Sequence, residues 1–480
     1  MYENCSDYAL VAEIESAARA ESMAVARRMA AVAELYVRRQ GALAELDWCI
    51  TDYCDATAAE VSAALHISHA RAVSMVQHSC ALRHRLPTVL GVLLRGDVDY
   101  RVVSMILNRT DNVDPAALPA LDEAIAAECG KWGRLSLAKL RDRVDEFVCE
   151  VDPDGQRVPP TVDESRYLEV VPGSVPGMSD VVGRLRATDG AALDQRLRAI
   201  AGTVCAQDPR GLSQRLADAA GALARGAETL TCQCGTEGCA AAEVRASART
   251  AVIHVLAEQG TVDGTSNRPG YLRGMGVLPA ESVRGLVEGA AVRPLEVPGA
   301  EAQYRPSAVL REFLRWRDVT CRWNGCDRPA AGCDVDHTVP YPHGPTHPSN
   351  NKHYCRTHHL IKTFLVALGW SERQLPDGTI EFTAPSGHTY RNAAHGAVLF
   401  PALARPTGEV NIAAEPTSAA PEKLAKMPRR TRTRAQNRAA RIRAERRERA
   451  ALNAEQRRLD TEERRRHEEW LAANADPPPF

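Results

Sequence analysis

The chain has 480 residues, enough for two or three domains that each bury a hydrophobic core. Only 5% of the residues are aromatic, so the composition favours helices packed through small side chains and argues against a β-rich architecture. The net charge of −1 conceals an acidic body and a basic tail, because residues 421–470 hold 17 Lys and Arg against 9 Asp and Glu. This asymmetry suggests a polyanionic partner.

The N-terminal stretch and the hydropathy of the chain bear on its location. Residues 1–15 are acidic and lack the apolar run of a signal peptide, and no stretch approaches the roughly 18 apolar residues of a membrane span. We therefore expect a cytoplasmic protein with no membrane contact. In a reducing compartment its 14 cysteines should be metal ligands or small buried side chains rather than disulfides.

Residues 1–150 are expected to form a multi-helix N-terminal domain, because apolar and small residues recur at spacings of three and four. Within it, residues 56–77 have the spacing of two helices joined by a short turn. His66 stands where a DNA-reading helix-turn-helix usually has glycine in a left-handed conformation, and Ser68 is suited to cap the second helix. The pattern fits either an ordinary helical hairpin or a helix-turn-helix that binds DNA.

Residues 151–300 are expected to extend the helical domain with α+β structure. Residues 152–164 are typical of a linker, 167–187 of a two-stranded hairpin, 191–204 and 214–224 of helices, and 252–258 of a strand. The clustered Cys232, Cys234 and Cys239 predict either most of a second zinc site, completed by a ligand such as His254, or an exposed loop with reduced thiols. The cysteines scattered along helical sequence are expected to fill the core: Cys5, Cys49, Cys54, Cys80, Cys129, Cys149 and Cys205.

Residues 301–395 hold the strongest chemical signal of the chain. A helix over 307–317, with Ser307 as its cap, leads into residues 321–362, where cysteines and histidines gather. After them, residues 369–391 are expected to form strands joined by turns at Asp377-Gly378 and Ser386-Gly387. Two separable sets of candidate ligands lie between the helix and these strands.

The first set consists of two short-spaced pairs. Cys321 and Cys326 form one pair, and Cys355 and His358 form the other. Two such pairs, brought together by folding, make the closed tetrahedral thiolate and imidazole site that is typical of structural zinc. Cys333 is an alternative ligand for this site.

The second set consists of Asp336, His337, Asn350 and His359. The sequence VDHTVPY favours a strand, the Gly/Pro-rich residues after it a loop, and residues 352–365 a helix that Asn350 or Asn351 is suited to cap. Neighbouring residues on a helix point about 100° apart. His358 can therefore serve zinc while His359 faces the strand.

These residues resemble the HNH nuclease motif, whose core is a ββα-metal unit. DVDHTVPY is similar to its first element, Asn350 to its middle residue and His359 to its final histidine. The wider chain resembles the actinobacterial HNH-endonuclease family that carries a long N-terminal helical domain of unknown function. That resemblance covers residues 10–395 and includes LRHRLPTVLGVLLRGDVDY, YLEVVPGSVPGMSDVVGRLRA and the CxCxxxxC cluster.

The resemblance and the chemistry of the side chains together imply roles. A neutral imidazole suits a general base near pH 7, which is the role expected of His337. Asp336 and His359 are the expected ligands of Mg²⁺ or another divalent cation that keeps positions open for phosphate oxygens. Asn350 is expected either to orient His337 through its carbonyl or to join the metal shell, and Lys362 to contact phosphate.

The expected fold is mainly α with a small α+β region. A zinc-supported ββα-metal (HNH) domain over 301–395 follows the helical parts, then a linker over 396–428 and a charged helical tail over 429–480. The tail has no apolar face, so it is expected to be a solvated helix whose basic first half could follow a phosphate backbone, or a soluble appendage.

The expected function is that of a metal-dependent DNA endonuclease with structural Zn²⁺, a catalytic divalent cation, and His337, Asn350 and His359 as catalytic residues. Two alternatives stay open. One is a catalytically inactive zinc-containing protein that binds nucleic acid. The other is a helical partner-binding protein in which the zinc unit only stabilises the fold.

Overall fold

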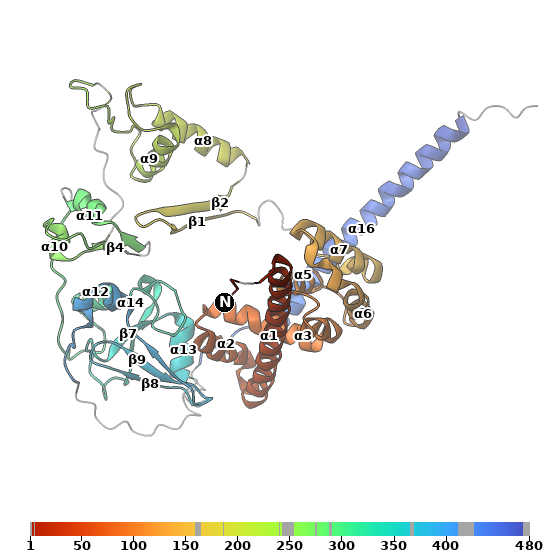
Figure 1. The fold of residues 1–480 in the computed structure, drawn as a ribbon, viewed down its shortest axis with the longest axis horizontal. Helices are drawn as coiled ribbons and strands as arrows, with labels where there is room; N and C mark the ends of the chain where they lie inside the picture. Colours follow the sequence, from red (N-terminus) through yellow and green to blue (C-terminus); the bar gives the residue numbers. More distant parts are fainter. Residues whose placement is uncertain are drawn as a thin grey trace, which may run out of the picture. The chain divides into compact units, whose positions relative to one another are not determined.

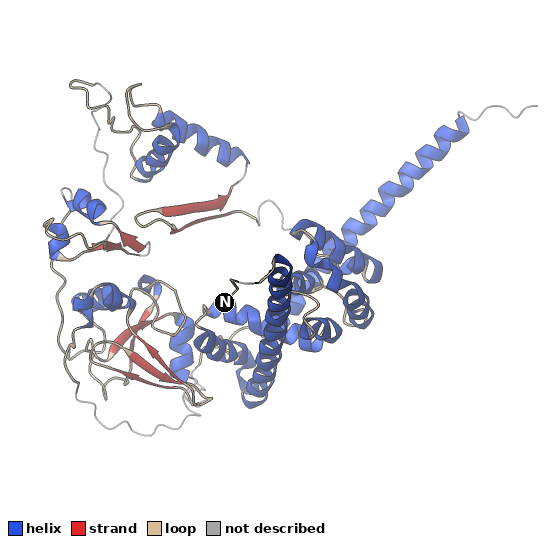
Figure 2. Ribbon diagram, viewed as in Figure 1, coloured by secondary structure: helices blue, strands red, loops and turns tan. Residues whose placement is uncertain are grey.

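The computed structural model describes residues 2–3, 5–158, 165–185, 187–239, 241, 254–273, 276–287, 290–364, 369–410 and 427–473. These residues are mainly helical with small sheets of two or three strands (Figure 1, Figure 2). The chain divides into two compact units. The first joins Met1–Val158 to Glu296–Phe480, and the second is Pro159–Leu295. The N-terminal helices and the segment expected to be a nuclease domain therefore belong to one unit.

The N-terminal part of the first unit is helical, as predicted. Its α-helices are α1 (Asp7–Ala42), α2 (Tyr53–Leu65), α3 (His69–His84), α4 (Pro87–Leu94), α5 (Tyr100–Arg109), α6 (Leu118–Glu128) and α7 (Leu137–Val151). Short 3-10 helices are η1 (Ala44–Trp48), η2 (Cys129–Arg134) and η3 (Pro153–Gly155). The core between the α-helices is built from aliphatic side chains that include Leu82, Leu93, Val103, Ile106, Leu121 and Val144.

The turn between α2 and α3 has the predicted local structure. His66 takes a left-handed conformation with φ of 54°, and the Ser68 hydroxyl accepts a hydrogen bond from the Arg71 amide. The turn packs against residues 324–325 of the same unit, where the Asn324 amide donates to the Ala63 carbonyl at 3.0 Å. A Cβ on Gly325 would lie 2.4 Å from the Ile67 carbonyl oxygen, so only glycine allows this approach.

The C-terminal part of the first unit begins with α12 (Ala308–Asp318), which Ser307 caps by accepting from the Leu310 amide at 3.1 Å. The next elements are η4 (Ala330–Gly332), β6 (Asp334–His337), β7 (Asn351–Tyr354) and α13 (Arg356–Phe364). A three-stranded antiparallel sheet follows in the order β10-β9-β8, from β8 (Ser371–Gln374), β9 (Ile380–Thr383) and β10 (Thr389–Asn392). Its turns contain Gly378 and Gly387 at positive φ, as the sequence predicted.

Two expectations for this part need correction. The helix expected from residue 352 begins at Arg356, because residues 351–354 pair with β6 in the register Asp336↔Lys352 and His337↔Asn351. The linker expected from residue 396 begins later. Residues 395–404 form α14 (His395–Leu399) and η6 (Pro401–Ala404), and Phe400 and Leu403 are buried.

The described part of the tail contains one helix, α16 (Arg434–Ala473), which has no buried residue, but its first half is bound on one side to other residues of the first unit, which was not expected. The residues before and within that half are bound to the N-terminal helical part through ion pairs: Arg430 and Arg434 with Asp52, Arg434 with Asp55, Arg438 and Arg441 with Asp111, Glu445 with Arg157, and Arg446 with Asp152. Met427, just before them, is 3% exposed. The contacts of α16 with the N-terminal part extend to Asn453, whose side-chain amide donates to the Asp154 carboxylate at 2.9 Å.

The second unit contains a hairpin, two packed helices and a small sheet. The hairpin is β1 (Tyr167–Pro172) with β2 (Ser179–Arg184), and the helices are α8 (Ala187–Ala201) and α9 (Leu212–Ala224). The sheet has the order β3-β4-β5, from β3 (Val255–Leu256), β4 (Gly270–Leu272) and β5 (Gly276–Leu278), and the helices α10 (Gln259–Val262) and α11 (Ala280–Val287) accompany it. Residues 159–164 of the expected linker and 252–253 of the expected strand lie outside the described residues.

Among the described residues, no helix combines the length and the apolar character that crossing a membrane requires.

Candidate functional site

Three cysteines and one histidine meet in the first unit, and they are the four residues predicted to do so. The ligand atoms of Cys321, Cys326, Cys355 and His358 all lie within 4.8 Å of one another. The His358 Nδ1 is 3.4 Å from the Cys321 Sγ and 3.3 Å from the Cys355 Sγ, so this nitrogen faces the thiols. Such a donor set could hold a metal ion such as zinc. Cys333 is not part of the cluster, and its thiol donates to the Pro329 carbonyl.

The surroundings of His358 keep its imidazole neutral, as a metal ligand must be. Burial lowers the pKa of His358 below its usual value. The Trp323 ring stacks on the imidazole, with centroids 4.9 Å apart and planes at 4°. The His69 ring from α3 meets the imidazole edge-on, with centroids 4.9 Å apart. The Nε2 of His69 is 3.3 Å from the Asp55 Oδ1. The cluster is therefore packed directly against the N-terminal helices.

Three of the four residues in the second predicted set come from β6 and α13. Asp336 and His337 end β6, and His359 lies in the first turns of α13. The Asp336 Oδ1 and the His359 Nε2 are 3.5 Å apart, so these two predicted ligands of a divalent cation are neighbours. The other nitrogen of His359 is 2.8 Å from the Asp334 carboxylate, which fixes the orientation of the ring.

Two lysines hold the Asp336 carboxylate. The Lys352 ammonium lies 2.9 Å and the Lys362 ammonium 3.0 Å from its Oδ2. Burial alone would raise the pKa of Asp336, but the charges of Lys352 and Lys362 outweigh it and lower the pKa to about 2. Asp336 is therefore ionised at neutral pH. A cation bound there competes with Lys362 for the same oxygens.

His337 is held between a hydroxyl and an aromatic ring. Its Nε2 is 2.9 Å from the Thr346 Oγ1, and the Tyr304 ring stacks on it with centroids 5.3 Å apart and planes at 11°. The Thr346 hydroxyl donates its own proton to the Gln303 carbonyl at 2.6 Å, so its oxygen accepts from the His337 Nε2–H. This arrangement leaves Nδ1 as the unprotonated nitrogen. Burial lowers the pKa of His337 to about 4, which keeps the ring neutral at pH 7.

Asn350 does not make the contact with His337 that one of its two expected roles requires. Its side-chain oxygen accepts from the Val339 amide at 2.9 Å, and its nitrogen donates to the Val339 and Pro345 carbonyls at 3.0 and 2.9 Å. The amide thus closes the loop between β6 and β7. In the structure Asn350 supports the loop that carries Thr346 rather than contacting His337.

An arginine-rich cleft opens beside these residues. His337, His359 and Asp334 line it, together with Tyr304 and four arginines: Arg305, Arg311, Arg315 and Arg356. Guanidinium groups bind phosphate oxygens in a planar, bidentate way. These arginines and Asp334 were not predicted from the sequence. The spacing of Arg311 and Arg315, four apart on one helix, was the signal that could have revealed one face of the cleft.

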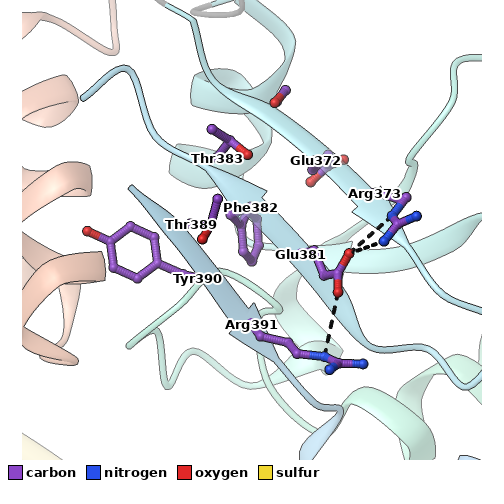
Figure 3. Close-up of a pocket in the computed structure, with 9 residues that line it drawn as sticks. Glu372, Arg373, Glu381, Phe382, Thr383, Thr389, Tyr390 and Arg391 are labelled. Carbon is purple, nitrogen blue, oxygen red and sulfur yellow. Dashed lines mark hydrogen bonds and ion pairs between the residues drawn. The ribbon is translucent and has the colours of Figure 1, made fainter. Parts of the chain in front are cut away.

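A second hollow lies on the β8–β9–β10 sheet (Figure 3). Glu381 stands between Arg373 and Arg391 on the neighbouring strands and pairs with both, at 2.5 and 3.7 Å. None of the predicted site residues lines this hollow, and these three charges satisfy one another across the strands. We assign no chemistry to it.

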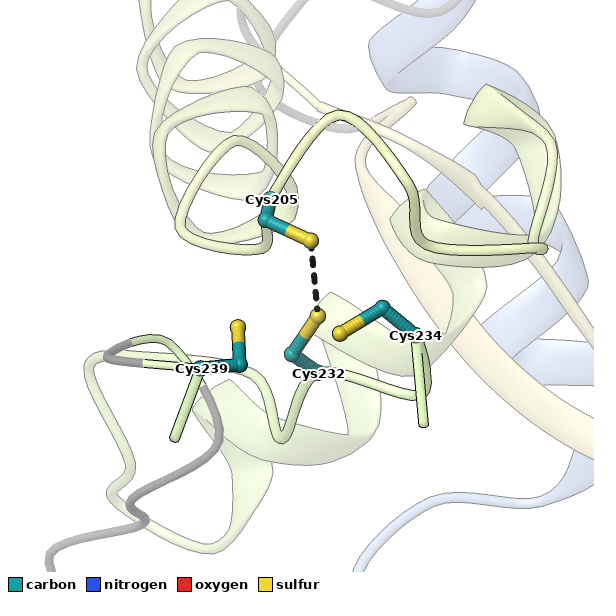
Figure 4. Close-up of side chains that lie close together, drawn as sticks. All are labelled: Cys205, Cys232, Cys234 and Cys239. Atoms are coloured by element: carbon teal, nitrogen blue, oxygen red, sulfur yellow. Dashed lines mark hydrogen bonds between the residues drawn. The ribbon is translucent and has the colours of Figure 1, made fainter. Parts of the chain in front are cut away.

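The remaining cysteines are placed differently from the expectation. Cys205, expected to fill the core, lies within 4.8 Å of Cys232, Cys234 and Cys239, and His254 is not part of this group (Figure 4). Cys49, Cys54 and Cys129 are buried as expected. Cys80 is partly exposed, and Cys5 and Cys149 are exposed, so the last two do not fill the core.

Comparison with known proteins places the chain among relatives whose roles are not established. Residues 16–318 match the family described as Domain of unknown function (DUF222). The uncharacterized protein Rv3776 of Mycobacterium tuberculosis is 43% identical over 92% of this chain and 90% of its own length. The uncharacterized protein Rv2100 of the same organism is 42% identical over 92% of this chain and 87% of its own length. No solved structure matches the chain.

Proposed function

This chain belongs to the DUF222 family, and from the geometry of the arginine-rich cleft we propose that it is a metal-dependent DNA endonuclease with an HNH active site. The observation that carries the proposal is a cleft lined by His337, His359 and four arginines, with the buried Asp336 carboxylate 3.5 Å from His359. Phosphodiester hydrolysis needs a base for water, a cation at the phosphate and groups that hold the strand. Each of these has a candidate at the cleft.

The base is His337, acting through Nδ1. Its ring is neutral at pH 7, because burial lowers its pKa to about 4. The Nε2–H is fixed by Thr346, so the lone pair of Nδ1 is available to take a proton from water. Thr346 is thus a positioning residue, since it acts through His337 rather than on the substrate.

Asp336 and His359 would hold a hard divalent cation such as Mg²⁺. A carboxylate oxygen and an imidazole nitrogen 3.5 Å apart fit one ion in donor type and in spacing, provided that Lys362 gives up its contact with Asp336. When bound, the ion supplies positive charge at the phosphate and leaves positions open for its oxygens. Lys362, once displaced, remains beside the cleft as a second cation for the phosphate.

Zn²⁺ at Cys321, Cys326, Cys355 and His358 has a structural role in this proposal. Four protein ligands leave no open position for substrate, which is typical of structural zinc. Cys355 immediately precedes α13, His358 lies in its first turn, and His359 is the next residue. Zinc at this cluster therefore fixes the start of the helix that carries a ligand of the catalytic cation.

The proposal is tested with supercoiled plasmid and purified protein, with Mg²⁺, with Mn²⁺, and with EDTA alone. The expected result is nicked or linear plasmid that depends on both the divalent cation and His337. A His337→Ala protein that retains zinc and still cuts at the wild-type rate would overturn the assignment of the base. Absence of cleavage by the zinc-loaded wild type under every condition would overturn the proposal itself.

One observation favours a second candidate function, a catalytically inactive zinc-containing protein that binds nucleic acid. Lys352 and Lys362 both pair with Asp336, so the carboxylate has two cations within 3.0 Å. If these lysines are never displaced, the four arginines still bind phosphate and the cleft holds DNA without cutting it. Salt-sensitive DNA binding, with no cleavage at any Mg²⁺ or Mn²⁺ concentration, distinguishes this candidate from the nuclease.

A further inference from the structure

Four cysteines converge in the second unit, which contributes no residue to the proposed nuclease site. Cys205 follows α8, and Cys232, Cys234 and Cys239 lie on the loop after α9 (Figure 4). All four sulfur atoms lie within 4.8 Å of one another, and the Cys205 and Cys232 sulfurs are 3.4 Å apart. The sequence did not predict that Cys205 joins the other three cysteines, because Cys205 and Cys232 are 27 residues apart.

The backbone around the cysteines is built to aim the thiols at one point. Gly235 and Gly238 take φ of 68° and 76°, which lets the loop reverse between Cys234 and Cys239. The Asp208 carboxylate accepts from the Gln233 amide at 2.9 Å, and the Arg210 guanidinium donates to the Thr231 carbonyl at 2.7 Å. These bonds join the segment after Cys205 to the segment that carries Cys232.

The helices around the cysteines have a small core of their own. It consists mainly of small and aliphatic side chains, among them Ile200, Ala201, Val204, Ala219, Ala222 and Leu230, with Cys232 at its edge. A core of this size contributes little stability, and small folds of this kind commonly depend on a metal or a disulfide. The 3.4 Å separation is well beyond the roughly 2.05 Å of a disulfide bond, and all four cysteines are free thiols.

We propose that Cys205, Cys232, Cys234 and Cys239 form a second metal site, a closed Cys₄ site that binds Zn²⁺ and fastens the loop after α9 to the end of α8. Zinc–sulfur bonds of about 2.3 Å place the sulfurs of a tetrahedral site roughly 3.8 Å apart, which fits the observed group. Four thiolates select a soft cation over Mg²⁺ or Ca²⁺. A four-iron cluster would hold the sulfurs further apart, because its iron–sulfide core lies between them.

The first measurement is the metal content of the purified full-length chain. The expected value is two Zn²⁺ per chain, one at this site and one at Cys321, Cys326, Cys355 and His358. Cys205→Ser and Cys239→Ser should each lower the content to one, and so should Cys355→Ser at the other site. Cys149→Ser is the matched control, because Cys149 is exposed and belongs to neither cluster, and it should keep two.

One zinc in the wild type, or two in Cys205→Ser, would overturn the proposal. Because Cys205→Ser could also unfold the second unit, a measurement that leaves the site intact accompanies it. In Co²⁺-loaded Cys355→Ser protein the remaining site should give the intense thiolate-to-cobalt charge-transfer bands of a four-sulfur tetrahedral site. A spectrum of six-coordinate cobalt without those bands would overturn the proposal whether or not the protein cuts DNA.

Discussion

At the scale of single residues, the proposed chemistry depends on which nitrogen of His337 carries a proton. Thr346 decides this, because its only hydroxyl proton goes to the Gln303 carbonyl and its oxygen is left to accept from Nε2–H. Thr346 is fully buried, so a residue without the hydroxyl would leave the Nε2–H without a partner. Substitutions at His337 and at Thr346 therefore test two different roles: His337 is proposed to take the proton, and Thr346 is proposed to orient His337.

His337→Ala should lower the rate of plasmid nicking by about 10²- to 10⁴-fold, the range typical of losing a general base, with zinc content and DNA affinity unchanged. The rate is measured by single-turnover nicking at saturating Mg²⁺. His343→Ala is the control, because His343 lies in the loop between β6 and β7, which begins directly after His337, and does not line the cleft. Equal losses in the two variants would show that loop damage, rather than loss of the base, is being measured.

Thr346→Val should lower kcat by roughly tenfold, about 1.4 kcal/mol for one mispositioned hydrogen bond, and leave KM for the plasmid unchanged. Thr346→Ser should restore most of the rate, since it keeps the hydroxyl. The two variants are compared by steady-state kinetics and by thermal unfolding. A Val variant with normal kcat, or a Ser variant as slow as Val, contradicts the positioning role.

At the scale of elements, α16 is the largest departure from expectation, and it changes the role of the tail. Its basic first half is paired with the carboxylates of Asp52, Asp55, Asp111 and Asp152. The second half, residues 454–473, holds five arginines against six acidic residues, so it offers no excess positive charge. We therefore expect the tail to stabilise the N-terminal helices through ion pairs rather than to contact DNA phosphates.

Deleting residues 427–480 should destabilise the chain by about 2–5 kcal/mol, because it removes the partners of buried carboxylates such as Asp52. Deleting residues 454–480 should leave stability unchanged. Thermal unfolding of both truncated chains beside the full one checks the prediction. Equal stability of all three chains would show that the ion pairs along α16 contribute nothing.

The difference in stability between the full chain and the 427–480 deletion should also depend on pH. Burial alone would raise the pKa of Asp111 and of Asp152, but Arg438 and Arg446 outweigh it and lower both below the ordinary value. Stability from such groups is complete above the unfolded pKa of about 3.9 and is lost as the pH falls through the lowered folded values. The stability gap between the full chain and the 427–480 deletion should therefore be constant from pH 7 to pH 5 and narrow below about pH 4.

The features that the sequence predicted depend on residues close together along the chain. The features that it missed depend on residues far apart along the chain. The Ser307 and Ser68 caps and the turns at Gly378 and Gly387 depend on immediate neighbours, and all were predicted. The Cys321 cluster was predicted because its ligands come in short-spaced pairs. β7 was missed because its polar sequence, NKHY, is strand only through pairing with β6. Cys205 and the contacts of α16 depend on partners that are distant along the chain.

At the scale of the whole molecule, the N-terminal helices and the segment that carries the Cys321 cluster meet at the α2–α3 turn. The turn that suggested DNA reading has Asn324 and Gly325 against it, and the first residue of α3, His69, contacts His358. In a DNA-reading helix-turn-helix the start of the second helix contacts base edges. That end of α3 is occupied by protein here, so the geometry favours an ordinary hairpin that supports the metal cluster.

Gly325→Ala should destabilise the chain by about 1–3 kcal/mol, because Gly325 combines a left-handed conformation with close contact to the Ile67 backbone. Gly332→Ala is the control, since a Cβ there meets no atom within 4 Å. Chemical denaturation measures both, with zinc content determined on each variant. If Gly325→Ala is as stable as Gly332→Ala, the turn and the segment that carries the Cys321 cluster are not in tight contact in solution.

The ion pairs between α16 and the first helices also set an order of events during synthesis. Asp52 is only 1% exposed, and its arginine partners lie at positions 430 and 434. A ribosome that has translated the N-terminal helices, which end at Val151, has about 280 further residues to add before Arg430 exists. Until then the nascent chain holds exposed or unpaired carboxylates at the start of α2. The N-terminal helices of this protein therefore reach their final state only when almost the whole chain has left the ribosome.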